Sequence, residues 1–356
     1  MIEIPIFYKI FLKCILYIFY PLSWLYQFLF FLKKKNTSPQ KIPNSLVISV
    51  GNLSVGGTGK TPFVIYLSNL IAQLDNTIQI TILSRGYGGK NSKQGMKVEN
   101  DSNPIFSGDE PLLIKKSLEN ANVIIGVNRL ASYQKYANTN TGKNVILLDD
   151  GFQHFAIERN LDIVLVDSIR LLGNGFTIPL GTLREKHTAL KRARIVVFTK
   201  SEQANPNEIE KITAKFLAVN PSLQIYHSYY ETRSLLNLLG DSLDIIQVSG
   251  QKVFTFSGIA SPETFVNSIK KMNPALLGFQ RFKDHYSYSE NDILKILKTA
   301  SEYDLVVCTE KDYVKIKDYK IESNLAKKIY YLKISLCLKK EDEFLDYLRG
   351  MLKITS

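Results

Sequence analysis

Eight consecutive residues have the composition and the order of a loop that binds nucleotide phosphates. They are Ser54, Val55, Gly56, Gly57, Thr58, Gly59, Lys60 and Thr61. Glycines in such a loop let backbone N–H groups turn inward around a phosphate. The lysine then reaches the β- and γ-phosphates, and the hydroxyl of the next residue binds Mg²⁺. The usual pattern opens with glycine, whereas Ser54 takes that position here. The pattern predicts a nucleoside triphosphate site; a glycine-rich turn without chemical function is the competing interpretation.

Two adjacent carboxylates, Asp149 and Asp150, follow the apolar run at residues 145–148. A buried strand that ends in an acid is typical of nucleotide-binding proteins, where the carboxylate holds Mg²⁺ directly or through water. Alone the signal is weak, because many strands end in aspartate. Together with the loop it predicts that Thr61, Asp149 and Asp150 hold Mg²⁺, with the closer of the two aspartates left open. A turn or helix-capping role would explain one aspartate better than both.

The elements that must position these groups alternate as an α/β fold requires. The β-branched run at 46–50 is typical of a buried parallel strand, and residues 63–67 continue the loop as a helix whose positive N-terminus faces the anion. Further strands are predicted at 78–84, 122–126, 145–148, 161–167 and 194–199. We therefore expect a P-loop NTPase-like, doubly wound parallel sheet with ligands at the carboxyl ends of its strands. Thr61, Arg85 and Asp149 all lie at such ends.

The last third of the chain predicts a second, smaller α/β domain. Its pattern is a strand, two helices and a strand at 253–257, 262–272, 290–303 and 305–309. Strand-like segments at 223–230 and 328–338 flank it, and we expect them to pair as a connector that lets this domain hinge toward the first. The predicted division assigns residues 1–35 to an N-terminal helix and residues 36–222 to a P-loop nucleotide- and substrate-binding domain. Residues 223–250 form a connector with a strand, 251–327 the small α/β domain, and 328–356 a return strand with a C-terminal helix.

The N-terminal segment at residues 10–32 is apolar and rich in aromatic side chains, and three lysines follow it. A secretory signal is disfavoured because no cleavage site with small residues follows. The length and apolarity also fit a membrane-spanning helix or a buried core helix. Pro21 near the middle and the many Tyr and Trp rings favour a helix at the membrane interface. Either membrane interpretation places the lysines and the nucleotide site on the cytosolic side, so we expect peripheral or monotopic association with the cytoplasmic face of a membrane.

The composition limits the partners. The chain has 356 residues, a formal net charge of +12 and a pI near 9.3, which favour an anionic partner. The positive charge is scattered and no RNA-binding signature is present, so we expect no nucleic-acid partner. The three cysteines are far apart and predict neither a disulfide framework nor a zinc site. A reducing cytosol fits this usage, and we expect a monomer.

The motifs together resemble the tetraacyldisaccharide 4'-kinases, the lipid A kinases of Gram-negative bacteria. The resemblance covers nearly the whole chain, its motifs stand in the family's order, and the family also opens its phosphate loop with Ser or Thr. The matching segments are Gly51-Asn52-Leu53-Ser54-Val55-Gly56-Gly57-Thr58-Gly59-Lys60-Thr61-Pro62, Leu83-Ser84-Arg85-Gly86-Tyr87-Gly88, Gly108-Asp109-Glu110-Pro111, Leu148-Asp149-Asp150-Gly151-Phe152-Gln153-His154, Gly181-Thr182-Leu183-Arg184-Glu185, Phe256-Ser257-Gly258-Ile259-Ala260, Asp284-His285-Tyr286 and Thr309-Glu310-Lys311-Asp312.

The resemblance implies transfer of the γ-phosphate of ATP to the 4'-hydroxyl of an acylated glucosamine disaccharide 1-phosphate, which gives lipid IVA. It also implies that Asp109 is the general base, that His285 orients and polarises it, and that Lys60 is catalytic. A carboxylate and an imidazole in contact share a proton more readily than either alone. From the residues alone, Asp109 can also be interpreted as the cap of a helix near Pro111, and His285 as a solvated loop histidine.

Five further residues are candidates for the substrate site. Arg85, Arg129 and Arg184 follow strands or glycine turns, where a guanidinium is well placed to bind the phosphate of the substrate. Each of them could instead be an ordinary surface arginine. Glu110 and Gln153 are expected to contact Mg²⁺ or substrate hydroxyls.

Two other classes of protein remain open. One is a membrane-associated GTPase or metallochaperone-type switch, because the segment 309–312 resembles a guanine-recognising Asn-Lys-x-Asp element. That element should follow a strand of the phosphate-loop sheet, whereas this segment belongs to the second domain, and strong GTP selectivity without a lipid acceptor would favour the switch. The other is a structural membrane adaptor with an inert nucleotide fold, which measurable phosphate transfer would exclude.

Overall fold

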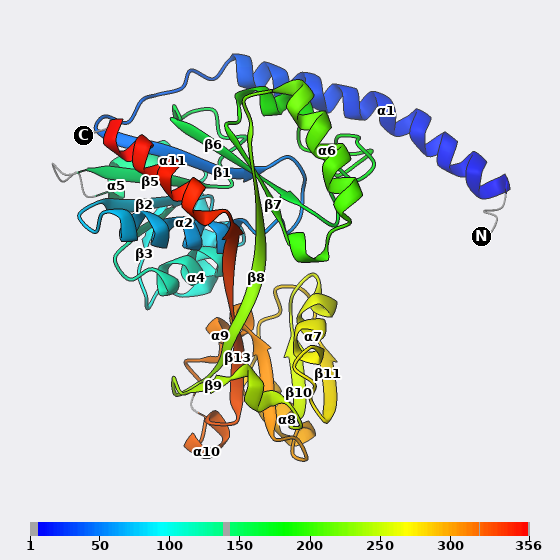
Figure 1. Cartoon of the computed structure of the whole chain (residues 1–356), viewed down its shortest axis with the longest axis vertical. Coiled ribbons are helices and arrows are strands. Elements are labelled where there is room, and N and C mark those ends of the chain that lie inside the picture. Colours follow the sequence, from blue (N-terminus) through cyan, green and yellow to red (C-terminus); the bar gives the residue numbers. More distant parts are fainter. Residues whose placement is uncertain (1–5, 138–142, 320, 355–356) are drawn as a thin grey trace.

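The computed structural model describes residues 6–137, 143–319 and 321–354. A larger body and a smaller body are joined by two long strands, β8 (Gln224–Asn237) and β13 (Ile329–Lys339), and the long helix α1 (Ile6–Lys35) runs outward from the larger body (Figure 1). All main strands belong to one continuous sheet, whose order is β11-β10-β12-β13-β8-β7-β6-β1-β5-β2-β4-β3. The two bodies therefore share hydrogen-bonded backbone and not only a linker.

The larger body is built on seven strands, all parallel except the short edge strand β3. Strands β1, β5 and β6 at its centre are almost entirely buried and consist mainly of Val, Ile and Leu, as a sheet covered on both faces requires. Within the described residues of the larger body, the predicted strands are confirmed within a few residues, and β3 is the one strand that the sequence pattern did not predict. The strands are β1 (Ser45–Asn52), β2 (Gln79–Ser84), β3 (Met96–Val98), β4 (Asn122–Ile125), β5 (Asn144–Asp149), β6 (Leu161–Asp167) and β7 (Ile195–Thr199).

Helices cover both faces of this sheet. On one face α2 contributes Phe63 and Leu67 to a core that also contains Phe344 of the C-terminal helix. On the other face Phe216 of α6 stacks on Phe198 of β7, with ring centroids 6.0 Å apart. The helices of this body are α2 (Lys60–Leu74), α3 (Pro104–Ser107), α4 (Asp109–Ser117), α5 (Arg129–Tyr136), α6 (Pro206–Val219) and α11 (Glu341–Ile354), with short 3₁₀ turns η1 (Lys90–Ser92), η2 (His187–Arg192) and η3 (Ser201–Gln203).

The connector is a two-stranded antiparallel ribbon, so the predicted pairing of the two flanking segments is confirmed. The pairing runs from His227 opposite Lys339 to Asn237 opposite Tyr330, with a register shift between Lys333 and Ile334. The sequence pattern had ended the first of these strands at residue 230. Strand β8 continues because β13 supplies hydrogen-bond partners across a polar stretch that has no strand signal of its own.

The smaller body is a parallel α/β unit in which β10 lies between β11 and β12. Its two faces carry separate apolar cores, one around Phe256 and Ile293 and the other around Phe265 and Val307. The edge strand β11, none of whose six residues is fully buried, was missed by the sequence pattern. The elements are η4 (Ile245–Val248), β9 (Ser242–Asp244), β10 (Lys252–Ser257), α7 (Pro262–Lys270), β11 (Leu276–Arg281), α8 (Glu290–Thr299), β12 (Leu305–Thr309), α9 (Glu310–Ile316) and α10 (Ser323–Ala326).

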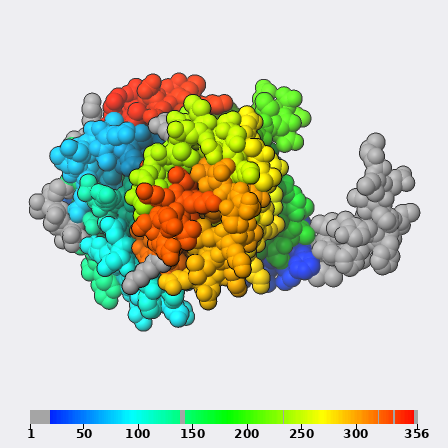
Figure 2. All heavy atoms as spheres, turned by 90° about the horizontal axis from the view of Figure 1, so that it is seen from below, coloured from blue at the N-terminus to red at the C-terminus, as the bar shows by residue number. Residues whose placement is uncertain are grey.

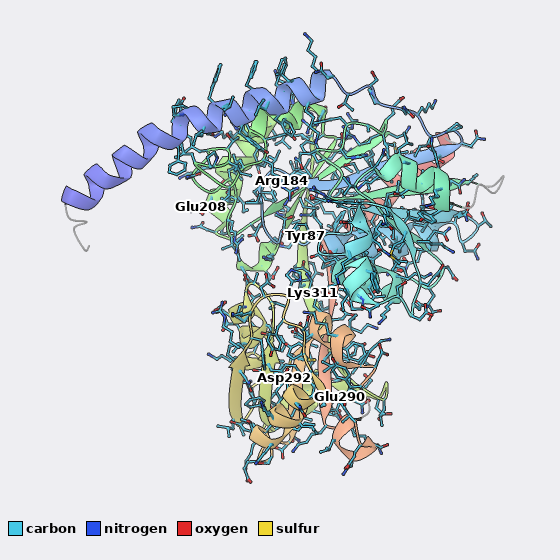
Figure 3. All side chains as sticks on the ribbon, turned by 180° about the vertical axis from the view of Figure 1, so that it is seen from behind. Tyr87, Arg184, Glu208, Glu290, Asp292 and Lys311 are labelled. Atoms are coloured by element: carbon cyan, nitrogen blue, oxygen red, sulfur yellow. The ribbon has the colours of Figure 1, made fainter. Side chains whose placement is uncertain are left out.

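The two bodies meet along a boundary beside the connector. Seen from below, atoms of the smaller body, yellow to orange, lie next to the cyan part of the larger body, which contains α3 and α4 (Figure 2). Helix α4 contacts α9 across this boundary. Arg184 and Tyr87 lie on the larger-body side and Lys311 at the top of the smaller body (Figure 3).

Helix α1 is continuous through Pro21 and packs on the larger body through one side of its C-terminal half. Ser23 is buried and donates to the carbonyl of Thr177 at 2.9 Å, and Phe30 meets Phe155 edge to face with ring centroids 5.7 Å apart. Trp24 on the other side is 66% exposed. In the described part of the chain, no helix combines the length and the apolarity needed to cross a membrane. Residues 1–5 and 355–356 of the predicted terminal segments lie outside the described residues.

Candidate active site

The phosphate loop lies between β1 and α2, and two of its glycines have backbone conformations that favour glycine. Gly56 has φ of +109° and Gly59 has φ of +80°. The loop is fixed from both sides: Asn52 donates from Nδ2 to Thr58 Oγ1 at 2.9 Å, and the Thr199 hydroxyl donates to the Thr58 carbonyl at 3.1 Å. Gly59 caps α2 without a side-chain hydrogen bond to the first turn. No side chain therefore caps the N–H groups at the start of α2, which leaves them available to an anion, as anion-binding loops require.

Asp150 lies between two cations at the end of β5. Its carboxylate accepts from Arg184 Nη1 at 2.8 and 2.7 Å, and Lys60 Nζ lies 3.5 Å from its Oδ1. Burial works to raise the pKa of Asp150, but Lys60 and Arg184 outweigh it and hold that pKa below its usual value. Asp150 is therefore an anion that organises the lysine of the phosphate loop.

Asp149 is in a different environment although it is the neighbouring residue. It is 4% exposed, and Ser84 donates to its Oδ2 at 2.8 Å. Burial, followed by the nearby Glu110 carboxylate, raises the pKa of Asp149. Among the described residues no cation lies within ion-pair distance of this carboxylate. A divalent cation would supply the missing countercharge.

The donor set fits Mg²⁺ held partly by nucleotide phosphates. Thr61 is buried in the first turn of α2 and Asp149 ends a strand that pairs directly with β1. No group of three or more His, Cys, Asp or Glu side chains within the described residues is arranged to hold a metal ion on its own. Mg²⁺ usually takes one or two protein oxygens and completes its shell with water and phosphate, so a hydroxyl and a carboxylate suffice.

Asp109 and His285 meet across the boundary between the two bodies. His285 Nδ1 lies 3.1 Å from Asp109 Oδ2, and Lys315 Nζ lies 3.7 Å from the same oxygen. Asp109 is the first residue of α4. Gly108 is the N-cap residue of this helix, and no side chain makes a capping hydrogen bond to its first turn. The interpretation of Asp109 as a helix-capping residue is therefore wrong. His285 follows β11 with φ of +58° and is half exposed, so its imidazole reaches out from its own body.

A second contact across the boundary involves the residue after Asp109. Lys311 Nζ donates to Glu110 Oε1 at 2.8 Å. Burial raises the pKa of Glu110, but Lys311 most of all, with Lys60 and His285, lowers it below its usual value. Lys311 and Lys315 both come from α9, and sequence reasoning missed both as site residues. Their spacing on one helical face was the available signal.

Asp312, the carboxylate that a guanine-recognising element would use, has a structural role, which removes the sequence feature that favoured a switch protein. Asp312 is fully buried, and both of its oxygens accept from the Gly258 N–H at 3.2 Å. Tyr288 and Thr309 donate hydroxyl hydrogen bonds to it at 3.0 and 2.6 Å. Its carboxylate is thus committed to joining β10, α9 and the loop before α8, and it has no free face for a guanine.

The three predicted arginines differ in their surroundings. Arg184 pairs with Asp150, as described. Arg129 is 5% exposed and donates to the backbone carbonyls of Asp149 at 2.6 Å and Asp150 at 3.2 Å, which favours a positioning role over substrate contact. Arg85 is exposed, and no hydrogen bond or ion pair engages its guanidinium in the described part of the chain. Of the three, Arg85 is the most available to an incoming anion.

Gln153 connects the end of β1 to the segment that carries Arg184. Its Nε2 donates to the Asn52 carbonyl at 2.9 Å and to Glu185 Oε1 at 3.0 Å. Glu185 in turn pairs with Arg192 at 2.6 Å, and the Arg192 guanidinium lies 3.7 Å from the centre of the Phe152 ring. Glu185 and Arg192 were not among the predicted site residues. Arg192 holds Glu185, and Glu185 positions Gln153 by accepting its hydrogen bond.

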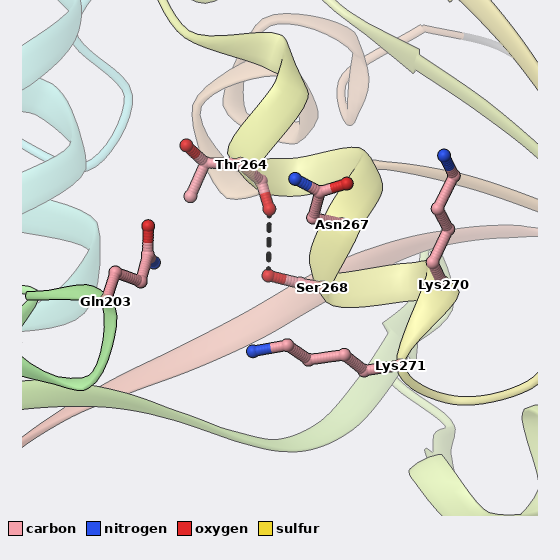
Figure 4. A pocket seen from close by; sticks show the side chains of 6 residues that line it. All are labelled: Gln203, Thr264, Asn267, Ser268, Lys270 and Lys271. Atoms are coloured by element: carbon pink, nitrogen blue, oxygen red, sulfur yellow. Dashed lines mark hydrogen bonds between the residues drawn. The ribbon is translucent and has the colours of Figure 1, made fainter.

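A cavity of about 410 Å³ lies between η3 of the larger body and α7 of the smaller body. Lys271 extends toward Gln203, whereas Lys270 projects away from it (Figure 4). The Ser268 hydroxyl donates to the Thr264 carbonyl at 3.0 Å within α7. None of the predicted site residues lines this cavity. The bodies are therefore packed closely at α4 and α9 but leave space at α7.

Comparisons with known proteins agree on one family. The family model described as "LpxK: Tetraacyldisaccharide-1-P 4'-kinase" matches residues 15–353. The tetraacyldisaccharide 4'-kinase of Leptospira biflexa is 35% identical over 364 residues, which cover 96% of each chain. That of Syntrophus aciditrophicus is 35% identical over 322 residues, which cover 86% of this chain and 84% of the relative. A crystal structure of LpxK from Aquifex aeolicus in complex with ATP matches with a TM-score of 0.73 at 28% identity, over 94% of this chain and 98% of that chain.

Proposed function

The chain belongs to the tetraacyldisaccharide-1-P 4'-kinase family, and from this premise we propose how its residues carry out the reaction. The protein is an ATP-dependent kinase that transfers the γ-phosphate of ATP to the 4'-hydroxyl of tetraacyldisaccharide 1-phosphate in lipid A biosynthesis. The observation that carries the assignment of roles is the contact of Asp109 with His285. Besides Lys311, the charges of Lys60 and His285 both lower the pKa of Glu110, the residue after Asp109, which supports a base near the phosphate loop.

The phosphate loop and Lys60 bind the triphosphate. Residues 54–61 form the loop around the β- and γ-phosphates, and Lys60 balances the charge that spreads over the phosphoryl oxygens. Asp150 supports this role, because its carboxylate holds Lys60 at 3.5 Å and Arg184 at 2.7 Å before the nucleotide enters. Preorganised charge costs little reorganisation at the moment of transfer.

Asp109 accepts the proton of the 4'-hydroxyl as the oxygen attacks the γ-phosphorus. The bond from this oxygen to phosphorus forms, the bond to the β-phosphate oxygen breaks, and ADP leaves. His285 keeps the Asp109 carboxylate oriented and stabilises the proton that Asp109 receives. Lys315 adds a positive charge, with its Nζ 3.7 Å from Asp109 Oδ2. Because Asp109 and His285 belong to different bodies, the base is complete only when the bodies are together. This requirement limits ATP hydrolysis by water.

Thr61 and Asp149 would hold Mg²⁺, with Asp150 farther away because Lys60 and Arg184 occupy its oxygens. The metal ion supplies charge neutralisation at the β- and γ-phosphates. The raised pKa of Asp149 and the absence of a cation beside it in the described residues support this order of the two aspartates.

The acceptor binds on the side of the sheet that carries β5, β2 and β4. Arg85 and Arg184 bind its 1-phosphate or neighbouring oxygens, and Glu110 and Gln153 bind sugar hydroxyls. The division of the chain at 36–222, 223–250, 251–327 and 328–356 fits this arrangement, since the connector ribbon lets the smaller body bring His285 toward the acceptor. The charge pair of Lys311 with Glu110 stabilises the closed position.

Helix α1 attaches the enzyme to the cytoplasmic face of the inner membrane, where its acylated acceptor resides. Trp24, Phe28 and Phe31 share one side of the helix and are 66%, 45% and 57% exposed. Aromatic rings are most stable at the depth of lipid head groups, and Lys33, Lys34 and Lys35 follow in the last turn to meet anionic lipids. We expect the enzyme to lie on the membrane as a monomer.

A transfer assay tests these roles. Radiolabelled ATP is incubated with the purified full chain and the disaccharide monophosphate in detergent micelles, and labelled lipid product is counted. The wild-type protein is expected to form product and Lys60→Ala to lose several orders of magnitude in turnover. Absence of lipid product from the folded wild-type protein would overturn the function. Near-normal turnover of a folded Lys60→Ala protein would overturn the assignment of the loop.

A further inference from the structure

Arg170 lies directly against the phosphate loop. A Cβ atom built on Gly56 would stand 3.0 Å from Arg170 Nη1, so the guanidinium touches the space beside the third residue of the loop. Arg170 follows β6, which pairs with β1 through Gly51 and Asn52, immediately before the loop. Its guanidinium is therefore on the loop and not merely on the same edge of the sheet.

The backbone around Arg170 is a tight, hydrogen-bonded turn. Asp167 Oδ1 accepts from the N–H groups of Ile169 at 2.9 Å and Arg170 at 3.1 Å. The Leu171 N–H donates to the Asp167 carbonyl at 2.7 Å. Asp167 is 3% exposed and pairs through Oδ2 with Lys200 at 2.7 Å. A buried carboxylate thus fixes the position from which the arginine side chain projects.

The charge of Arg170 is also unbalanced. Lys60 and Arg184 pair with Asp150, Lys311 with Glu110 and Lys315 with Asp109. Within the described residues, by contrast, no carboxylate pairs with Arg170 and no hydrogen bond engages its guanidinium. An exposed arginine without a partner is ordinary on a protein surface. One that rests on a phosphate-binding glycine is in position to meet the anion that the loop binds.

We propose that Arg170 is a further catalytic residue, whose guanidinium binds oxygen atoms of the phosphoryl group during transfer. This proposal rests on the phosphoryl transfer described above. Arg170 neither gains nor loses a proton: the hydroxyl proton goes to Asp109 and the leaving group is ADP. Its two donor nitrogens bind the phosphoryl oxygens, whose negative charge spreads in a loose transition state, as an arginine supplied within the same chain does in other P-loop enzymes. Asp167 is a positioning residue for it.

The substitutions Arg170→Ala and Arg170→Lys test this role, with Arg194→Ala as the matched control. Arg194 is an exposed arginine at the opposite end of β7, away from the loop. We expect Arg170→Ala to lower kcat at least about 100-fold with little change in KM for ATP, and Arg170→Lys to recover only part of the loss, because lysine lacks the planar pair of donors. Added guanidinium ion should partly restore Arg170→Ala. The Arg194→Ala control should keep wild-type kinetics.

A binding measurement separates transition-state contact from a structural role. The probes are ADP alone and ADP with aluminium fluoride, which mimics the phosphoryl group in transfer, both with Mg²⁺. Arg170→Ala should bind ADP as the wild type does and lose at least about 10-fold in affinity for the aluminium fluoride complex. Equal losses for both probes, a change confined to KM, or wild-type kcat in a folded Arg170→Ala protein would overturn the proposal. If the wild-type protein makes no lipid product, the result overturns the kinase function and not the role of Arg170 within it.

Discussion

His285 Nδ1 lies 3.1 Å from Asp109 Oδ2, although the two residues are 176 positions apart in the chain. One side chain starts α4 of the larger body and the other projects from a loop of the smaller body. The connector ribbon of β8 and β13 brings them together, and Lys311 with Glu110 makes a second contact on the same boundary. The general base that we propose and its partner thus come from two bodies, and the activity of the kinase should depend on residues of both.

Asp109 and His285 should behave as one unit in kinetics. Asp109→Ala should depress turnover strongly and leave ATP affinity nearly intact, because the carboxylate acts on the acceptor hydroxyl and not on the nucleotide. His285→Ala should impair the same step, and the double variant should be little worse than the more severe single variant. Turnover and nucleotide binding are measured for all four proteins. Losses that multiply would show that the two side chains work independently.

The two aspartates after β5 should respond differently to magnesium. Asp149→Asn should raise the Mg²⁺ concentration needed for half-maximal turnover, because it removes the carboxylate that we propose as the Mg²⁺ ligand and that has no cation partner among the described residues. Asp150→Asn should instead lower turnover at saturating Mg²⁺, because Lys60 and Arg184 lose the anion that positions them. Titrations of activity with Mg²⁺ distinguish the two effects. A larger shift of the Mg²⁺ requirement for Asp150→Asn would reverse the assignment.

Helix α1 should bind membranes through its exposed aromatic side. We expect Trp24→Ser, Phe28→Ser and Phe31→Ser, combined in one protein, to reduce co-sedimentation with anionic vesicles and to lower activity on lipid more than ADP binding, because they remove the rings that lie at head-group depth.

The control for this variant removes three exposed apolar side chains from the smaller body instead of from α1. The three control residues are exposed aliphatic side chains, Leu239, Ile246 and Leu294, each changed to Ser. The control protein should sediment with vesicles as the wild type does. Full sedimentation of the α1 variant would mean that another surface anchors the protein.

The free energy of unfolding should decrease as the pH falls, because His154 titrates differently in the folded and the unfolded chain. Burial, with the charges of Arg129 and Arg159, lowers the pKa of the His154 imidazole from 6.5 to about 3. Between these two values the unfolded chain binds a proton at this residue and the folded chain does not, so stability is lost as the pH falls through this window. His154→Gln should remove part of that loss. Urea unfolding of both proteins at several pH values between neutral and mildly acidic checks it, and parallel pH dependences would contradict the prediction.

The phosphate loop could be recognised from sequence because all of its determinants are local. The glycines at 56 and 59, Lys60 and the strand before them act within a few residues of one another, and their backbone requirements do not depend on distant contacts. The same holds for Asp149 at the end of a buried apolar run. Alternating strands and helices likewise predicted a parallel sheet, since each strand carries its own apolar pattern.

Tertiary structure alone decided which side chains meet and which are buried. No local pattern distinguishes Arg129, enclosed and bound to backbone carbonyls, from Arg85, which is exposed. Asp312 has the sequence context of a nucleotide-binding residue but is surrounded by hydrogen-bond donors of its own body. The contact of Arg170 with the phosphate loop depends on the pairing of β6 with β1. Such relationships arise from the packing of elements distant in sequence, and that packing depends on the summed free energy of many contacts and not on any single segment.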